Sequence, residues 1–214
     1  MQYTKQDIAK MDKIQKIKFI NSISGIKPAN LIGTISNKNQ TNVAIFSSVV
    51  HLGSEPALLG FITRPTGEVP RHTFENIIEN KQYTINHVPN SITKNAHYTS
   101  IKLERDQSEF EACGLTEEYI EGFKAPFVKE STIKMGLEFK EYIDITLNGT
   151  ILVIGEIKHL IIPNAAISEE EDIDLSNIET AGISGLNTYY SLKKIAHYPY
   201  ARVTEIPDFK SSKL

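Results

Sequence analysis

A series of short apolar segments separated by polar turns dominates the sequence between residues 31 and 163, and this pattern is typical of β-strands. The last two segments meet at Asn148-Gly149, a pair that favours a tight β-hairpin turn. The polar stretch NKNQ (37–40) predicts another hairpin. We therefore expect antiparallel strands that close into a barrel, because closure leaves no exposed edge. The expected strands are LIGTIS (31–36), NVAIFSSVV (42–50), ALLGFIT (57–63), QYTINHV (82–88), LEFKEYIDITLNG (137–149) and TILVIGEIKHLIIP (150–163).

Helical spacing of apolar residues occurs in two longer segments. Residues 4–23 place isoleucines at helical intervals with lysines between them, and this helix is expected to end near Gly25. Its apolar stripe favours contact with the core or with another subunit over contact with a membrane surface. RHTFENIIENK (71–81) predicts a helix after the third strand. Residues 89–135 are expected to be irregular, apart from a short helical piece at 115–123.

Composition indicates an ordinary globular protein. The 214 residues carry a net charge of −3, which argues against a general nucleic-acid binder. We find no secretion signal and no apolar run of about 18 residues, so neither export nor a membrane span is expected. The single cysteine, Cys113, allows no internal disulfide, and a cytoplasmic location is expected. We treat 1–214 as one domain with an N-terminal helical extension (1–25) and a C-terminal cap (180–214).

Several common sites are absent from the sequence. It contains no GxGxxG or GxxxxGK[ST] loop for nucleotides, no HExxH, no paired CxxC and no GxSxG. The histidines do not cluster at zinc-ligand spacing, so no metal is expected. Cys113 lies among apolar neighbours, which favours a small core thiol over a nucleophile. The acidic run SEEEDIDLSN (168–177) is interpreted as a solvated loop rather than a cation site.

Groups that attract anions are concentrated after the third strand. Arg64 follows that strand, and Arg71, His72 and Thr73 stand at the expected start of the helix. The free N–H groups of a helix start favour an anion, and a guanidinium adds charge-assisted hydrogen bonds. The segment predicts a phosphate site, with a surface loop carrying two solvated arginines as the alternative.

Two adjacent serines end the second apolar strand. Ser47 and Ser48 point to opposite faces unless a bulge intervenes, so one of them can face a ligand. The apolar residues before them suit a flat ring. Together with the phosphate site, they indicate a ligand with a planar head and a phosphate tail.

The same segments resemble the flavin reductase-like family, whose members have an FMN-binding split barrel. NVAIFSSVVHLGSEPALLGF followed by RHTFENIIENKQYTINHV carries the resemblance, which continues through EFEACGLT, APFVKES and SGLNTYY. It implies a mainly β fold, a six-stranded antiparallel Greek-key split barrel with flanking helices, and a homodimer with FMN near the interface. One departure is Glu55-Pro56, where a proline pair is common in the family. His197 is only a loose match to the family's nicotinamide-pocket histidine.

The resemblance also implies the residues of a cofactor site. Ser47 and Ser48, with the backbone of Val49 and Val50, are expected to line the flavin ring and ribityl chain. The phosphate is expected at Arg64, Arg71 and Thr73, and His72 is also expected to bind the cofactor. The remaining expected cofactor-binding residues are Asn42 on the second strand, Asn86 and His87 near the cofactor, and Asn187 and Tyr190 in the C-terminal cap.

The function implied is an NAD(P)H-dependent flavin reductase that passes a hydride from NADH or NADPH to FMN, with FAD as an alternative flavin. No catalytic side chain is expected, since the flavin carries the chemistry. Two alternatives stay open: an FMN-bound electron carrier without free-flavin turnover, and a non-catalytic binding protein for a phosphorylated ligand. A partner oxygenase is a further expectation, and no nucleic-acid or membrane partner is expected.

Overall fold

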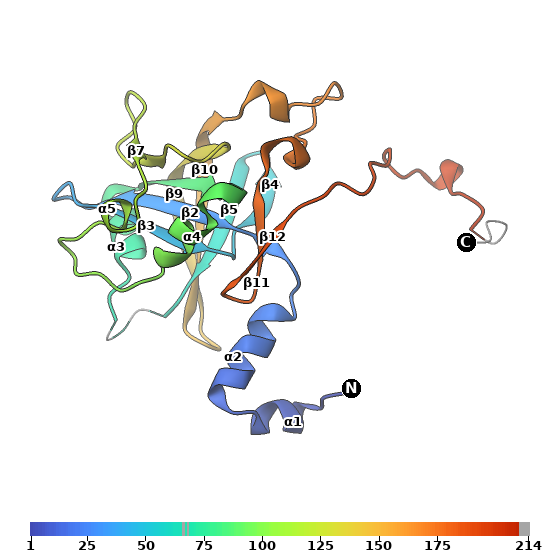
Figure 1. Cartoon of the computed structure of the whole chain (residues 1–214), viewed down its shortest axis with the longest axis horizontal. Helices are drawn as coiled ribbons and strands as arrows, with labels where there is room; N and C mark the ends of the chain where they lie inside the picture. The colour runs from blue at the N-terminus through green and yellow to red at the C-terminus, as the bar shows by residue number, and fades with distance from the viewer. Residues whose placement is uncertain (66, 68, 210–214) are drawn as a thin grey trace.

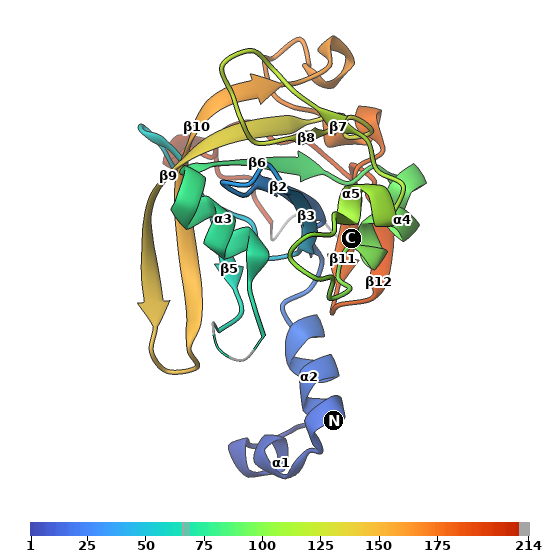
Figure 2. The same ribbon diagram turned by 90° about the vertical axis from the view of Figure 1, so that its left-hand side faces the viewer.

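An antiparallel sheet of seven strands organises the computed structural model, which describes residues 1–65, 67 and 69–209 (Figure 1). The strand order is β3-β2-β6-β9-β10-β5-β4, so β3 and β4 lie at the two edges. Curvature of this sheet gives the barrel seen in Figure 2. The bounds are β2 (Asn30–Ile35), β3 (Thr41–Phe46), β4 (Val50–Ser54), β5 (Ala57–Thr63), β6 (Gln82–His87), β9 (Lys134–Ile145) and β10 (Thr150–Ile161).

The predicted single strand at 42–50 is wrong, because the chain ends one strand at Phe46 and begins β4 at Val50. The sheet therefore has seven strands instead of the expected six. Ser48 causes the change, since its Oγ accepts a hydrogen bond from the Ile62 N–H (3.1 Å) and donates one to the Ile62 carbonyl (3.0 Å). The pairing of Val50 with Gly60 places Ser48 opposite Ile62, so a side chain takes over from the backbone ladder there. The other five predicted strands are confirmed within a few residues.

Both faces of the sheet are covered, as adjacent residues of β2 illustrate. Ile32 is fully buried in the barrel interior with Phe61 and Tyr83, whereas Leu31 is fully buried in a second cluster with Val43. Side chains alternate between faces along a strand, so one strand can serve both cores. The outer cluster is closed by helical and C-terminal segments.

The predicted helix at 71–81 is confirmed as α3 (His72–Asn80). In the supposedly irregular region, short helices α4 (Thr93–Tyr98) and α5 (Glu109–Ala112) and the turn η1 (Asn90–Ile92) were not expected. The helical piece predicted at 115–123 is wrong. Instead β7 (Glu117–Glu118) pairs with β8 (Phe127–Val128), and Gly122 has a φ of +78°, a conformation that a helix does not use.

The expected single N-terminal helix is also wrong, because it is divided into α1 (Lys5–Lys10) and α2 (Lys13–Ser22). Asp12 causes the division, since its carboxylate accepts hydrogen bonds from the N–H groups of Ile14 and Gln15 and so begins a new helix. Neither helix buries a residue. No helix in the described part of the chain is both long and apolar enough to cross a membrane.

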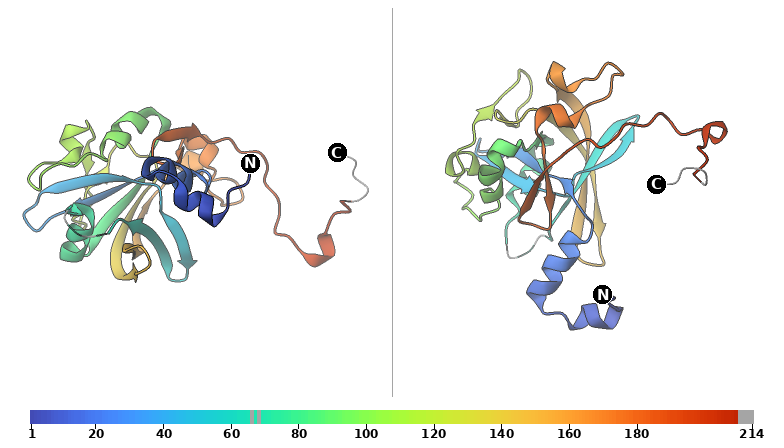
Figure 3. Two further views of the ribbon diagram at one scale, coloured as in Figure 1. Left: turned by 90° about the horizontal axis from the view of Figure 1, so that it is seen from below. Right: turned by 45° about the vertical axis from the view of Figure 1, so that its right-hand side comes forward.

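A second, three-stranded sheet joins the two ends of the chain in the order β1-β11-β12. Its strands are β1 (Lys27–Pro28), β11 (Ala181–Ser184) and β12 (Thr188–Ser191), and the turns η2 (Asn164–Ala166) and η3 (Leu175–Ile178) precede it. After β12 the chain leaves the body as an extended arm that carries η4 (Val203–Glu205) (Figure 3).

Gly155 provides a direct test of the barrel packing. A Cβ at this position would lie 2.2 Å from Oη of the fully buried Tyr83, where a bulge interrupts the pairing of β9 and β10. Overpacking of this kind costs about 1–3 kcal/mol. We therefore expect Gly155→Ala to lower the midpoint of thermal unfolding by roughly 2–12 °C.

Gly53→Ala is the matched control, because its Cβ would meet nothing closer than 3.7 Å. Differential scanning fluorimetry on both variants measures the effect. Equal midpoints for wild type and Gly155→Ala would show that the barrel does not pack around Tyr83 as described.

Candidate functional site

Two arginines frame the segment between β5 and α3. Arg64 directly follows β5 and is exposed, and Arg71 is the residue before α3. Arg71 Nε donates a hydrogen bond to the Pro65 carbonyl (3.1 Å), which holds its side chain against the 64–71 loop. Neither guanidinium has a carboxylate partner among the described residues. The segment therefore carries two positive charges without a described carboxylate partner, and its one acidic residue, Glu68, lies outside the described residues.

The start of α3 adds backbone donors to the same place. The first N–H groups of a helix have no acceptor within it, and no side chain caps this helix. One acidic group lies close, because Glu75 accepts a hydrogen bond from the Arg71 N–H (3.1 Å). The other oxygen of Glu75 pairs with Arg105 Nη1 at 2.5 Å, which offsets its charge. The arrangement is typical of a phosphate-binding helix start.

Thr73 and Asn42 are brought together, although they were predicted as separate cofactor contacts. Thr73 Oγ1 donates a hydrogen bond to Asn42 Oδ1 (2.9 Å), and Asn42 Nδ2 donates one to the buried Glu109 (2.6 Å). Burial raises the pKa of the Glu109 carboxyl. The network fixes α3 to β3, so Thr73 and Asn42 position the arginine-bearing loop. Their direct contact with a cofactor stays a prediction.

The link between β3 and β4 carries the predicted flavin-lining residues. Ser48 uses its hydroxyl on Ile62, as described above, and Val49 packs against the barrel interior. Ser47 is half-buried, and its side chain makes no hydrogen bond to the described residues. Val50 is 46% exposed at the start of the edge strand. Ser48 holds this link against the end of β5. Ser47 therefore lies close to Arg64, which follows that strand.

A buried amide that the sequence reasoning missed lies in the same end of the barrel. Asn30 is 1% exposed, and neither atom of its side-chain amide has a hydrogen-bond partner among the described residues. The strand register places Asn30 between Phe46 and His87, so these three side chains share the interior face. Buried polar groups are nearly always paired, so this amide needs a ligand or a buried water. A partner for Asn30 would lie beside the β3–β4 link.

His87 and Asn86 point to opposite faces of β6. Burial lowers the pKa of His87 to about 4, so its imidazole is neutral at physiological pH, and its Nδ1 lies 3.4 Å from Thr180 Oγ1. Asn86 is fully buried with its amide satisfied by the protein: Nδ2 donates to the Leu31 carbonyl and to Thr84, and Oδ1 accepts from the Val128 N–H. His87 therefore stands beside Asn30, and Asn86 braces the outer face.

The remaining predicted residues lie elsewhere. His72, at the start of α3, lines a cavity of about 10 Å³ that it shares with Asn76 and Arg105. Asn187 and Tyr190 belong to the β11–β12 hairpin of the small sheet, and both are exposed. No described contact joins that hairpin to Ser47, Arg64 or Arg71 within one chain.

A larger cavity of about 380 Å³ lies outside the predicted site. The acidic loop after η2 and the base of the C-terminal arm line it, including Asp174, Leu192 and Lys194. Neither this cavity nor the small one includes Ser47, Arg64 or Arg71. Of the predicted cofactor residues, Ser47, Val50 and Arg64 are partly or fully exposed, whereas Asn42, Thr73 and Asn86 are buried.

Comparison with known proteins identifies the family. The model of the flavin reductase like domain matches residues 26–175. A proposed flavin reductase with a split barrel domain from Shewanella frigidimarina is 48% identical, with a TM-score of 0.90 over 94% of this chain and 100% of that one. Nitrilotriacetate monooxygenase component B from Bacillus cereus, 17% identical, has a TM-score of 0.80 over 92% and 98%.

A third structure, the FMN-binding protein from Thermus thermophilus, is 13% identical and has a TM-score of 0.69 over 82% of this chain and 91% of that one. At such identities these two likenesses concern the fold alone. The family match covers β1 to β10, the arginine-bearing loop and α3, but neither β11, β12 nor the helices before residue 26. The chain belongs to the family of flavin reductase-like proteins and has its split-barrel fold.

Proposed function

We propose that this protein binds FMN and transfers a hydride from NADH or NADPH to the flavin. One observation supports this most: two guanidinium groups, neither with a carboxylate partner among the described residues, flank an uncapped helix start after β5. A phosphate monoester carries nearly two negative charges at neutral pH, which matches this pair. The membership in the flavin reductase-like family supports the choice of FMN among phosphorylated ligands.

The residues present fit this cofactor. Arg64, Arg71 and the first N–H groups of α3 would hold the phosphate. The half-buried Ser47 and the exposed Val50 would lie along the ring and the ribityl chain. The unpaired amide of Asn30 offers an NH2 group as donor and a carbonyl oxygen as acceptor, which suits the polar edge of a flavin. The redox chemistry would be supplied by bound FMN, which accepts a hydride from a nicotinamide.

The protein's own part is then positioning and exclusion of water. Ser48 and the Asn42–Thr73 contact hold the two sides of the site in fixed relation, so that little ordering remains to be done on binding. His87, which is neutral at physiological pH, adds a polar group without a charge. No side chain in this arrangement is required to donate or accept a proton during hydride transfer.

A second copy of the chain would complete the site. Edge strand β4 exposes Val50 (46%) and Leu52 (41%) beside the candidate site. Unpaired edges with exposed apolar side chains are ready to associate. We therefore propose a homodimer, which would cover the ring. The likeness to nitrilotriacetate monooxygenase component B makes a partner oxygenase the proposed acceptor of reduced flavin.

The visible spectrum tests the function directly. We expect FMN added to the purified protein to bind, and anaerobic NADH or NADPH to bleach the flavin bands. Turnover of added free FMN separates a reductase from a carrier that keeps its flavin. Absence of FMN and FAD binding in a titration would overturn the proposal and leave a binding protein for another phosphorylated ligand.

The arginines have a specific signature in binding. We expect Arg64→Ala and Arg71→Ala each to weaken FMN binding by about 1.5–3 kcal/mol, because each removes a charge-assisted hydrogen bond. Riboflavin, which lacks the phosphate, should bind the wild type and both variants equally. Fluorescence titration with the two ligands measures this difference.

Arg202→Ala on the C-terminal arm is the matched control, since that guanidinium pairs with Glu205 rather than with the site. An equal loss of affinity for riboflavin and FMN would show that the arginines act on the fold, not on the phosphate.

Asn30 predicts opposite effects on stability and on binding. Asn30→Leu removes a buried amide without a partner, so the ligand-free protein should become more stable by about 1–3 kcal/mol. FMN should bind the same variant more weakly. Denaturant unfolding without ligand and an FMN titration give the two values. A gain in stability with unchanged FMN affinity would assign the amide to a buried water instead.

A further inference from the structure

The N-terminal helices pack only slightly against the rest of the chain that carries them. Helix α2 has ten residues, and helices of this length are marginal in water without packing. It buries no residue, and Ile14, Ile17, Ile20 and Ile23 are 42–78% exposed. Figure 2 shows α1 and α2 projecting below the barrel. A helix of this kind requires a partner surface.

One side of α2 combines apolar and basic groups, of which Lys16 is half-buried and donates a hydrogen bond from Nζ to the Ala9 carbonyl (3.3 Å). Lys13, Lys16, Ile17 and Ile20 are spaced i, i+3, i+4 and i+7, so they lie on one side of the helix. Residues 1–25 contain five lysines, and none of them forms an ion pair with the described residues. Both aspartates of this segment, Asp7 and Asp12, are used to cap the helices. This N-terminal arm, residues 1–25, therefore presents uncompensated positive charge beside exposed isoleucines.

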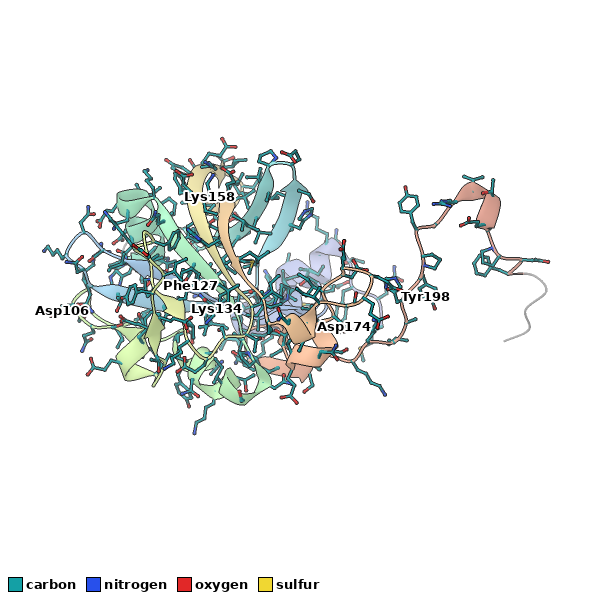
Figure 4. The ribbon with its side chains drawn as sticks, turned by 90° about the horizontal axis from the view of Figure 1, so that it is seen from above. Asp106, Phe127, Lys134, Lys158, Asp174 and Tyr198 are labelled. Atoms are coloured by element: carbon teal, nitrogen blue, oxygen red, sulfur yellow. The ribbon has the colours of Figure 1, made fainter. Side chains whose placement is uncertain are left out.

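A complementary surface exists at the other end of the molecule. The acidic loop, residues 168–174, contains five carboxylates and no basic residue. Lys194 pairs with Asp174 (3.0 Å) and His197 lies 3.6 Å from Glu170, but Glu169, Glu171 and Asp172 have no ion pair among the described residues. Figure 4 shows Asp174 at the base of the C-terminal arm, with Tyr198 farther along it.

The acidic loop is preorganised and has an apolar base. Ser168 Oγ accepts hydrogen bonds from the N–H groups of Glu170 (3.3 Å) and Asp172 (3.1 Å), which closes the loop on itself. Ile167 and Ile173, which form a bridge across the base of the loop, are 49% and 46% exposed. A helix face that carries isoleucines and lysines complements this loop. Its apolar side chains match the isoleucines at the base, and its positive charges match the carboxylates.

One chain does not make this contact, because α1 and α2 lie at one end of the molecule and the acidic loop lies at the other (Figure 1). We propose that the N-terminal arm of one copy docks, through Lys13, Lys16, Ile17 and Ile20, on the acidic loop of a second copy. In a twofold dimer the same contact forms twice. Opposite charges steer the encounter and fix the register, while the isoleucines supply burial.

Charge reversal tests the contact. The arm variant carries Lys13→Glu and Lys16→Glu, and the loop variant carries Glu169→Lys and Glu171→Lys. We expect each to weaken self-association by at least about tenfold in sedimentation equilibrium. An equimolar mixture of the two variants should associate as heterodimers, since each reversed surface then meets its opposite. Recovery of association on mixing would show that the contact forms between two copies and not within one chain.

The matched control is Lys38→Glu with Lys102→Glu, two exposed lysines outside both surfaces that form no ion pair with the described residues. It should associate as the wild type does. Self-association should also weaken between about 0.1 M and 1 M salt, as the Debye length falls from about 10 to 3 Å. Circular dichroism confirms that the variants stay folded.

An unchanged dissociation constant in both reversed variants would overturn the proposal. So would failure of the mixture to recover association, or a wild type that stays monomeric and instead floats with anionic lipid vesicles. All measurements use protein without flavin, so their outcome is independent of whether FMN is the ligand.

Discussion

The arrangement of the candidate site depends on Ser48. Its side chain takes the place of a backbone partner for both the N–H and the carbonyl of Ile62, where the sheet would otherwise end. The chain can therefore pass from one edge strand to the other while remaining attached to β5. The β3–β4 link, the end of β5 and the arginine-bearing loop are consequently kept at one end of the barrel. The Asn42–Thr73–Glu109 network does the equivalent for α3.

Much of the fold could be predicted from local patterns. The Asn148-Gly149 turn and the helix at 71–81 were predictable because turn chemistry and a strong apolar face are properties of neighbouring residues. Strand β4 was not, because its separation from β3 depends on Ser48 meeting Ile62, a contact between residues distant in sequence. The helices α4 and α5, with six and four residues, are too short for their periodicity to be detected.

The site was predictable in part. Arginines placed around a helix start indicate an anion without any structure, and the resemblance to the family supplied the flavin. Asn30 could not be identified, because an asparagine at the start of a strand is typical of turns, and its lack of partners is visible only when all neighbours are placed. Conversely, Asn86 and Thr73 looked free in sequence, but their polar atoms are bonded within the protein.

The small sheet links the two ends of the chain. The backbone of β1, which follows the N-terminal arm, pairs with β11, and Gly182 of β11 lies so close to Ile26 that a Cβ there would approach its side chain to 2.4 Å. Loss of the segment after residue 175 would leave β1 without a neighbour, and loss of the N-terminal segment would expose the edge of β11. We therefore expect the two ends to occur together, so that relatives with one of them also have the other.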